Sequence, residues 1–330
     1  MMDDDTSMFL QAEALDRASA DDVPLTRPFL NGREVELLSQ VLESGVLGRG
    51  ATLERFEHAF AQAADARVAV SAVTVPAAVR VLAEAAGWPQ GAVVAVSAFL
   101  PRAAGEALQA RGLELRVLDV DPVTLLPDAA TVAAARAGGA VDVLVVDPIG
   151  VAPTVEANGA TIVYDCERQL AIGPGAMLLT NDDDVAASWR RARGELGSAM
   201  GDLAAAVGMA QLEKLSRVLV LRQMVASEYA RLLRKADGVA TLPSDATGGR
   251  SWSTLPLLVD EAVDRDDVIA RVRANSIACE PLELLDDVDD SHPVAARVAR
   301  RGIAIPCFAQ LSPQQQQRVV DAVRGALVPE

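Results

Sequence analysis

The chain has 330 residues and a mass of 34.6 kDa, enough for one large domain or two domains of ordinary size. It carries 46 acidic and 30 basic residues, and this net charge of −16 argues against general binding to nucleic acids or anionic membranes. Only two of the basic residues are lysines, Lys214 and Lys235, so any chemistry that needs a lysine amine has two candidates.

The three cysteines and two histidines stand far apart in the sequence. Because no C-x-x-C or H-x-x-x-H spacing occurs, neither a structural zinc site nor a disulfide framework is indicated. The N-terminus, MMDDDTSMF, is acidic where a secretory signal would be basic, and no apolar run approaches the ~20 residues that a membrane span needs. We therefore expect a cytoplasmic protein without a metal site.

Residues 1–22 hold seven acidic residues and one basic residue, which predicts a flexible acidic tail. The apolar spacing of Val35, Leu38 and Leu42 then predicts a helix that stops at Gly45. A second apolar stripe from Leu53 to Ala63 predicts another helix.

Short apolar runs then alternate with Ala-rich amphipathic stretches, which predicts a mostly parallel sheet with helices on both faces. The expected strands are 67–73, 92–98, 114–119, 142–147, 161–165 and 176–180, and the expected helices are 75–87, 102–111, 128–137 and 183–196. Between Val146 and Thr161 about 14 residues remain, so that crossover has room for a helix of one or two turns.

Residues 201–236 are expected to form long helical structure. The pattern then changes to that of a small α+β domain, with strands at 253–259, 277–282 and 303–307, helices at 265–275 and 293–301, and a last helix capped by Ser312. We divide the chain into a tail (1–22), a large domain (23–240) and a small C-terminal domain (241–330). The acidic stretch 283–290 could bind a cation, but without glycine punctuation a solvated loop is favoured.

Two short motifs invite a functional interpretation. Gly48-Arg49-Gly50 could form a phosphate cradle, although no strand precedes it. Asp165 ends an apolar strand, and ligands of open α/β sheets lie at the carboxyl ends of strands. The alternative for Asp165 is a carboxylate that caps the next turn.

Seven segments together resemble the DegT/StrS family of sugar aminotransferases, which use pyridoxal phosphate (PLP). They are residues 24–29 (PLTRPF), 44–50 (SGVLGRG), 53–57 (LERFE), 118–122 (LDVDP), 176–182 (AMLLTND), 201–215 (GDLAAAVGMAQLEKL) and 311–319. The resemblance runs from about Pro24 to Val328. It implies an aspartate-aminotransferase-like fold (fold type I), in which PLP is held by a lysine, an aspartate, a Ser-Gly-Thr turn and a stacked aromatic ring.

The resemblance carries over to this sequence only in part. Asp165 matches the aspartate that pairs with the pyridinium nitrogen. The phosphate turn aligns with residues 71–76, where Thr74 is kept but Val73 replaces the glycine. Pro101 stands at the position of the stacking aromatic, and Arg168 replaces an amide or histidine.

The lysine of the family lies on a strand between the aspartate strand and the AMLLTND-like strand. Here only ten residues, 166–175, separate the two, so we expect that strand to be deleted. The large sheet would then be one strand short, with six strands and 161–165 beside 176–180. Lys214 falls where the family has an ordinary surface lysine, and Lys235 precedes Gly238 at a helix end. We therefore expect no cofactor, because the PLP lysine is absent.

Three hypotheses follow. In the first, the chain is a degenerate homologue that acts as a non-catalytic or partner subunit in sugar-nucleotide or secondary-metabolite biosynthesis. It would form a homodimer, or a heterodimer with an active paralogue, through the apolar helices of 201–236, and could bind a sugar nucleotide or another small molecule.

In the second hypothesis, an isomerase, cyclase or dehydratase reuses the old cleft without PLP. Strand alternation would place Asp165 and Glu167 on the same side as catalytic groups, in a cleft with Thr74, Tyr164 and Arg168. The third hypothesis is an aminotransferase with a relocated lysine.

Overall fold

The computed structural model describes residues 22–122, 124–146, 156–157, 159–234, 236, 238–241 and 251–328. The predicted acidic tail, the predicted one- or two-turn helix after Val146, and Lys235 therefore lie outside the described residues, apart from Asp22 and a few residues that end the crossover. Among the described residues, no helix combines the length and the apolar character that crossing a bilayer requires.

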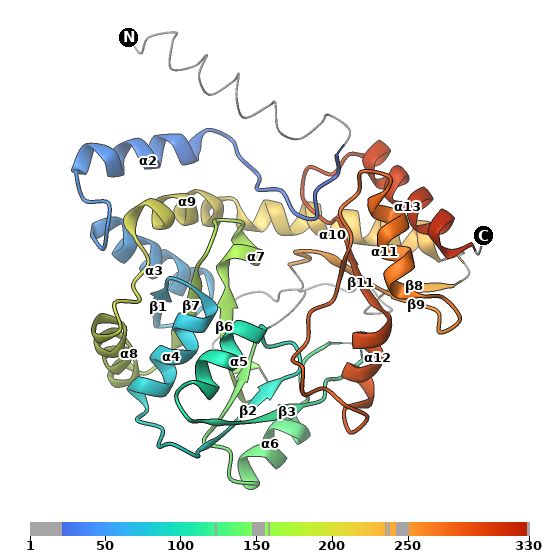
Figure 1. The fold of residues 1–330 in the computed structure, drawn as a ribbon. Coiled ribbons are helices and arrows are strands. Elements are labelled where there is room, and N and C mark those ends of the chain that lie inside the picture. Colours follow the sequence, from blue (N-terminus) through green and yellow to red (C-terminus); the bar gives the residue numbers. More distant parts are fainter. Residues whose placement is uncertain are drawn as a thin grey trace, which may run out of the picture.

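The chain forms a seven-stranded and a four-stranded sheet, each packed against helices (Figure 1). Six strands of the large sheet lie in the order β1-β7-β6-β4-β2-β3, and the two-residue strand β5 pairs with β6. Their bounds are β1 (Val68–Ala72), β2 (Val93–Ser97), β3 (Glu114–Leu118), β4 (Asp142–Val145), β5 (Glu156–Ala157), β6 (Ala160–Asp165) and β7 (Ala176–Thr180). The predicted neighbourhood of 161–165 and 176–180 is confirmed, whereas the predicted count of six strands is wrong because of β5.

The large sheet is parallel in its centre and antiparallel around β7. Strands β6, β4, β2 and β3 run parallel, and β7 runs antiparallel to both β6 and β1. The six long strands match the expected ones to within two residues at each end. Five of them consist largely of apolar residues, which is typical of strands covered on both faces, whereas the edge strand β3 (ELRVL) carries two charged residues and is only partly buried.

Helices cover both faces of this sheet, as predicted. One face packs on α4, α5 and α8, and the other packs on α3, α6 and α9. The bounds are α2 (Arg33–Ser44), α3 (Ala51–Ala63), α4 (Val75–Ala85), α5 (Arg102–Gln109), α6 (Ala129–Ala137), α7 (Cys166–Leu170), α8 (Asp183–Glu195) and α9 (Asp202–Glu213). Helix α2 ends at Gly45, which has the left-handed φ of 70° that favours glycine, so the predicted stop is confirmed.

A buried carboxylate fixes the start of α3. Oδ1 of Asp202 accepts hydrogen bonds from the N–H groups of Gly50 (2.9 Å) and Leu53 (3.0 Å), and Oδ2 accepts one from Thr52 (3.1 Å). A side chain on Gly50 would meet Asp202 Oδ2 at 2.6 Å, so only glycine permits this approach. The Asp202 carboxylate occupies the backbone donors that an anion would need, so the prediction that the backbone of Gly48-Arg49-Gly50 forms a phosphate cradle is wrong.

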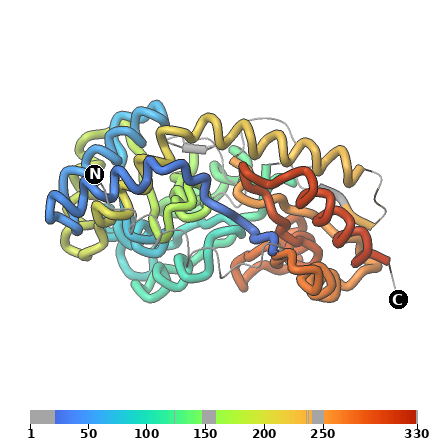
Figure 2. The backbone as a smooth tube through the Cα atoms, turned by 90° about the horizontal axis from the view of Figure 1, so that it is seen from above, coloured from blue at the N-terminus to red at the C-terminus, as the bar shows by residue number. Residues whose placement is uncertain are grey.

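The long helix α10 (Leu215–Leu233) connects the two sheets and runs along one side of both halves of the molecule (Figure 2). The second sheet is antiparallel in the order β10-β11-β9-β8. The remaining bounds are β8 (Val239–Thr241), β9 (Leu255–Val259), α11 (Arg265–Arg273), β10 (Glu280–Pro281), α12 (Pro293–Arg301), β11 (Gly302–Ile305) and α13 (Pro313–Leu327). Ser312 caps α13 in a capping box with Gln315, which confirms the predicted helix start.

The interiors of the two halves share side chains. Leu285, from the loop after β10, lies in the core that covers α4 and α5, and its N–H donates to the carbonyl of Ala98 at 2.9 Å. In the opposite direction, Phe99, Val120 and Leu125 lie in the core of the second sheet. The predicted domain boundary at residue 240 stays a prediction.

The close packing of α9 on α3 generates a stability prediction. A Cβ added at Gly208 would lie 2.6 Å from the ring of the fully buried Phe56. Overpacking of this kind costs about 1–3 kcal/mol, which outweighs the better helix propensity of alanine. We expect Gly208→Ala to lower the free energy of unfolding by about 1–2 kcal/mol in chemical denaturation.

Gly194 in α8 provides the matched control, since nothing lies within 4 Å of its added Cβ. Gly194→Ala should raise the free energy of unfolding by up to about 1 kcal/mol. Equal effects of the two substitutions would contradict the described contact between α3 and α9.

Candidate functional site

The carboxyl ends of β6, β4, β2 and β3 meet at one edge of the large sheet, because these strands are parallel. Ala176 of β7 pairs with both Ala72 of β1 and Asp165 of β6. Since neighbouring strands are separated by about 4.8 Å, the start of α4 after β1 lies roughly 10 Å from Asp165 at the same edge. Two of the predicted site residues, Thr74 and Asp165, are thus brought to one edge.

Asp165 is the N-cap of the short helix α7. Its Oδ1 accepts the backbone N–H of Arg168 at 3.2 Å, and its Oδ2 lies 3.5 Å from Nε of the same arginine. The residue is 8% exposed, and burial raises the pKa of its carboxyl, while the backbone N–H and the charge of Arg168 act in the opposite direction. The structure therefore shows the alternative that the sequence left open for Asp165: its carboxylate caps the next turn. This carboxylate is also buried and paired with Arg168.

The predicted alignment of Asp165 and Glu167 on one side of a strand is wrong. The strand ends at Asp165 and the chain turns into α7 at Cys166, so Glu167 lies exposed on a helix. Cys166 is buried, and burial raises the pKa of its thiol, which disfavours the nucleophilic thiolate.

Tyr164 does not line a cleft beside Asp165. It lies on the opposite face of β6, buried against α3, with its ring 5.8 Å from the ring of Phe60 in an edge-to-face contact. The successive residues of a strand point to opposite faces, and this separates Tyr164 from Asp165.

Arg168 joins the edge of the large sheet to the C-terminal part of the chain. Its Nη2 lies 3.3 Å from a carboxylate oxygen of Glu283, so it contacts both Asp165 and Glu283. Asp286 likewise pairs with Arg102 at the start of α5. The acidic stretch 283–290 thus provides ion-pair partners, and within the part of the chain that the structure describes no group of three or more potential ligands could hold a metal ion.

A cleft of about 700 Å³ opens beside these ion pairs, between α5 and the loop that follows β10. Pro101, Arg102 and Glu106 line one wall, and Glu283 and Asp286 line the other. Sequence reasoning did not assign Glu283 to the site, because nothing local connects it to Arg168, 115 residues earlier.

The turn at the start of α4 has few free backbone donors. The N–H of Val73 donates to the carbonyl of Ser198 at 2.9 Å, and the N–H of Ala77 donates to Oγ1 of Thr74 at 3.2 Å. Pro76 has no N–H to offer. Thr74 therefore serves as the N-cap of α4, and this turn is a poorer anion cradle than a glycine-containing one.

The amine of Lys214 is engaged in a buried ion pair. Its Nζ contacts the carboxylate of Glu34 in α2, lies 3.2 Å from Oδ1 of Asn31, and stands over the ring of Phe29 at 5.5 Å. Burial opposes ionisation of Glu34, but the hydrogen bond from Lys214 and backbone N–H groups leave its pKa lowered overall. Lys214 thus ties α2 to the junction of α9 and α10.

Comparisons with known proteins agree with this architecture. A sequence model of the DegT/DnrJ/EryC1/StrS aminotransferase family matches residues 28–158 and 156–324. The spore coat polysaccharide biosynthesis protein SpsC of Bacillus subtilis (strain 168) is 23% identical over 374 residues, which cover 92% of this chain and 96% of that protein. GDP-perosamine synthase of Caulobacter vibrioides is 28% identical over 194 residues, 51% of this chain and 52% of that enzyme.

The fold also matches solved structures. The aminotransferase TlmJ from Streptoalloteichus hindustanus superposes with a TM-score of 0.79 at 24% identity, over 93% of this chain and 99% of that one. This likeness confirms the expected fold-type-I architecture. Because the family model spans nearly all of the described sequence, the chain belongs to the DegT/DnrJ/EryC1/StrS aminotransferase family.

Proposed function

We propose that this chain is a family member that has lost Schiff-base chemistry with PLP. It would act as a non-catalytic or partner subunit in sugar-nucleotide or secondary-metabolite biosynthesis. The names of its relatives, which concern polysaccharide biosynthesis and GDP-perosamine, support the pathway class.

One observation carries this proposal. Strands β6 and β7 are paired directly, from Val163 with Leu178 to Asp165 with Ala176, and the ten residues between the two strands contain no lysine. The resemblance places the cofactor lysine on a strand between these two. A strand inserted there would have to break this hydrogen-bonded ladder in the middle of the sheet.

The remaining amines offer little compensation. Only a primary amine forms a Schiff base, and the chain has two lysine side chains. Lys214 forms a buried ion pair with Glu34, and neutralising its amine would leave that buried carboxylate without its counter-charge. Lys235 lies outside the described residues.

The other contacts expected for PLP are also weakened. The turn at α4 has Val73 and Pro76 where free backbone donors are needed, and Pro101 offers no aromatic face at the stacking position. Asp165 alone is a suitable group, and its carboxylate already caps α7 and pairs with Arg168. The residues present therefore do not fit covalently bound PLP.

A partner role is supported by exposed apolar side chains. Val35 (49% exposed) and Leu42 (61% exposed) lie two turns apart on the outer side of α2, and Val46 and Leu47 continue the patch. The predicted pairing surface at 201–236 fits less well in its first half, since α9 packs between α2 and α3. Further along, α10 exposes Val220 and Met224.

The cofactor proposal predicts the outcome of a trapping experiment. After equimolar PLP and borohydride, intact-mass and peptide analysis should find no stoichiometric pyridoxyl group on a lysine, in wild type or in Lys214→Arg and Lys235→Arg. An active relative, treated in parallel, should be fully labelled. A stoichiometric label that either substitution removes would refute the proposal and establish the relocated lysine.

The partner role predicts a defined association. Light scattering should find the chain as a dimer, or as a complex when an active paralogue is added, and Leu42→Glu should weaken that association about tenfold or more, since it buries a charge. Val141→Glu introduces the same charge at an exposed apolar residue outside α2 and should have no effect. A monomer that binds no paralogue would contradict this role.

A second candidate function is an enzyme that works without PLP, of the isomerase, cyclase or dehydratase type. The chain of contacts Asp165–Arg168–Glu283 beside the 700 Å³ cleft favours it, because a buried carboxyl with a raised pKa next to a guanidinium suits acid–base chemistry. In that case Asp165→Asn and Glu283→Gln should abolish a turnover found by screening sugar-nucleotide intermediates.

The setting of Asp165 predicts a pH dependence of stability. A carboxyl whose pKa is higher in the folded chain contributes stability below its unfolded pKa of about 4, and loses that contribution as the pH rises through the folded pKa. Asp165→Asn should therefore be more stable than wild type at pH 7, with the difference shrinking towards pH 4. Denaturation curves across this range measure it.

Asp128 is a matched control, because it caps α6 in the same way but is exposed. The backbone N–H of Thr131 lowers the pKa of its carboxyl, so Asp128→Asn should destabilise the chain at pH 7 and lose its effect at low pH. The same trend for both variants would contradict the described burial of Asp165.

A further inference from the structure

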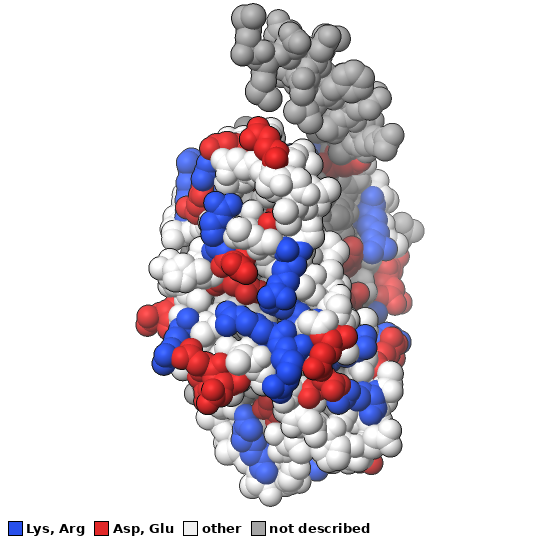
Figure 3. Space-filling model, turned by 90° about the vertical axis from the view of Figure 1, so that its left-hand side faces the viewer, with Lys and Arg blue, Asp and Glu red and all other residues white. Residues whose placement is uncertain are grey.

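A second cleft, of about 350 Å³, lies on the flank of the large sheet between α3, the start of β1 and α8. Four guanidinium groups and an imidazole line it, from Arg49, Arg67, Arg190, Arg193 and His58. Figure 3 shows the side of the molecule that carries α3 and α8, with basic side chains gathered over the middle of this face. A basic cleft is unusual in a chain with a net charge of −16.

The charges in this cleft are only partly balanced. Arg193 pairs with Glu57, and Arg67 pairs with Asp183. Arg49 and Arg190 have no carboxylate within ion-pair distance in the described ranges, and Glu54 is the one other acidic residue in the lining. An excess of positive charge therefore faces the cleft.

Glu57, Ser71 and Arg193 form a buried hydrogen-bonded cluster at the floor of the cleft. Oε1 of Glu57 accepts hydrogen bonds from the backbone N–H (2.9 Å) and the hydroxyl (2.8 Å) of Ser71, and Nη1 of Arg193 donates to the Ser71 carbonyl at 3.1 Å. Arg193 is 2% exposed, yet its Nε finds no hydrogen-bond acceptor in the part of the chain described. A buried donor without a partner is costly unless a ligand or water completes it.

The free edge of β1 borders this cleft and limits what can bind. Because Glu57 and Arg193 occupy the outward N–H and carbonyl of Ser71, an incoming peptide strand could not pair with β1 at that residue. The alternation of an antiparallel ladder leaves Ala69, two residues earlier and part of the cleft lining, with its N–H pointing away from β7. One free backbone position suits a compact ligand better than an extended peptide.

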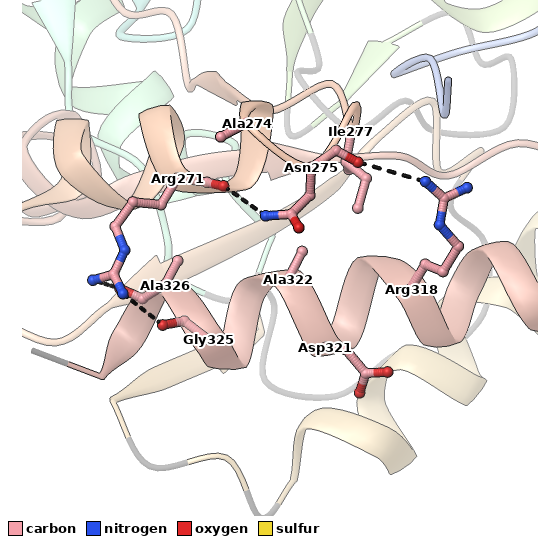
Figure 4. Close-up of a pocket in the computed structure, with 9 residues that line it drawn as sticks. All are labelled: Arg271, Ala274, Asn275, Ile277, Arg318, Asp321, Ala322, Gly325 and Ala326. Carbon is pink, nitrogen blue, oxygen red and sulfur yellow. Dashed lines mark hydrogen bonds between the residues drawn. The ribbon is translucent and has the colours of Figure 1, made fainter. Parts of the chain in front are cut away.

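The cavity between α11 and α13 is also lined by arginines, but these arginines have hydrogen-bond acceptors within the protein (Figure 4). Its volume is larger, about 550 Å³. There Arg271 donates to the carbonyls of Gly325, Ala326 and Val328 at the end of α13, and Arg318 donates to the carbonyl of Asn275. Those guanidinium groups hold two helices together, whereas Arg49 and Arg190 bridge no such pair of elements among the described residues.

We infer that the cleft between α3 and α8 binds a small molecule that carries a phosphate or diphosphate group. Arg49 and Arg190 clamp the anion, above a floor that includes Arg193 and Ala69. Planar guanidinium groups match phosphate oxygens in pairs, which gives arginine an advantage over lysine here. The cleft flanks β1 on its outer side, so this binding does not depend on Asp165 or on any amine.

Titration calorimetry with inorganic phosphate, pyrophosphate and a nucleoside diphosphate tests this inference. We expect saturable 1:1 binding of pyrophosphate that weakens with added salt, and a loss of roughly tenfold in affinity for each arginine removed in Arg49→Ala and Arg190→Ala. Arg55→Ala and Arg191→Ala remove the same charge from α3 and α8 outside the cleft, and should change the affinity less than twofold.

The comparison of the three ligands distinguishes a nucleotide-linked ligand from a free phosphate or diphosphate. Tighter binding of the nucleoside diphosphate than of pyrophosphate identifies a nucleotide-linked ligand, and equal binding identifies the free anion; both support the site. Equal losses in the cleft variants and the control variants would mean nonspecific charge attraction and would overturn it. Failure of all three anions, or tighter binding of an acidic peptide that Arg49→Ala abolishes, would also overturn it.

Discussion

The direct pairing of β6 with β7 is the constraint on which the rest of the large sheet depends. The ladder from Val163 and Leu178 to Asp165 and Ala176 sets the register, and β7 passes this register on to β1. The register thereby brings Thr74, the N-cap of α4, and Asp165, the N-cap of α7, to the same edge of the sheet. The same ladder leaves no place for a further strand between β6 and β7.

Buried carboxylates carry much of the remaining organisation. Asp202 holds the start of α3, Glu57 binds Ser71 and Arg193, and Glu34 holds Lys214. In each case the carboxylate meets several donors, which offsets the cost of removing its charge from water. The basic residues of these regions therefore have different roles. Lys214 and Arg193 form buried ion pairs, whereas Arg49 and Arg190 pair with no carboxylate in the part of the chain that the structure describes.

Sequence patterns predicted the long elements well, because runs of apolar residues and capping residues act locally. The strands of the large sheet, the stop at Gly45 and the cap at Ser312 all follow from neighbours in the sequence. The helix α7 was missed because five residues are too few to show a periodicity. That single turn also undid the expected alignment of Asp165 with Glu167, since a change from strand to helix alters which side chains share a face.

The long-range contacts of the site could not be predicted in this way. Arg168 meets Glu283 and Glu57 meets Arg193 across more than a hundred residues, and only the folded topology brings them together. Asp165 was found in advance because a carboxylate at the end of an apolar strand is a local signal. The cleft flanking β1 gave no such signal, since its arginines come from three separate segments of the chain: the loop before α3, the residue before β1, and α8.

The position of Leu285 has a consequence for the order in which this protein can fold during synthesis. The interior between α4 and α5 is built early in the chain, but one of its side chains arrives only after the second sheet has begun. A nascent chain that has released the whole large sheet from the ribosome still lacks this side chain and exposes the surface that it covers. The core around α4 and α5 is therefore complete only once the last quarter of the polypeptide has been made.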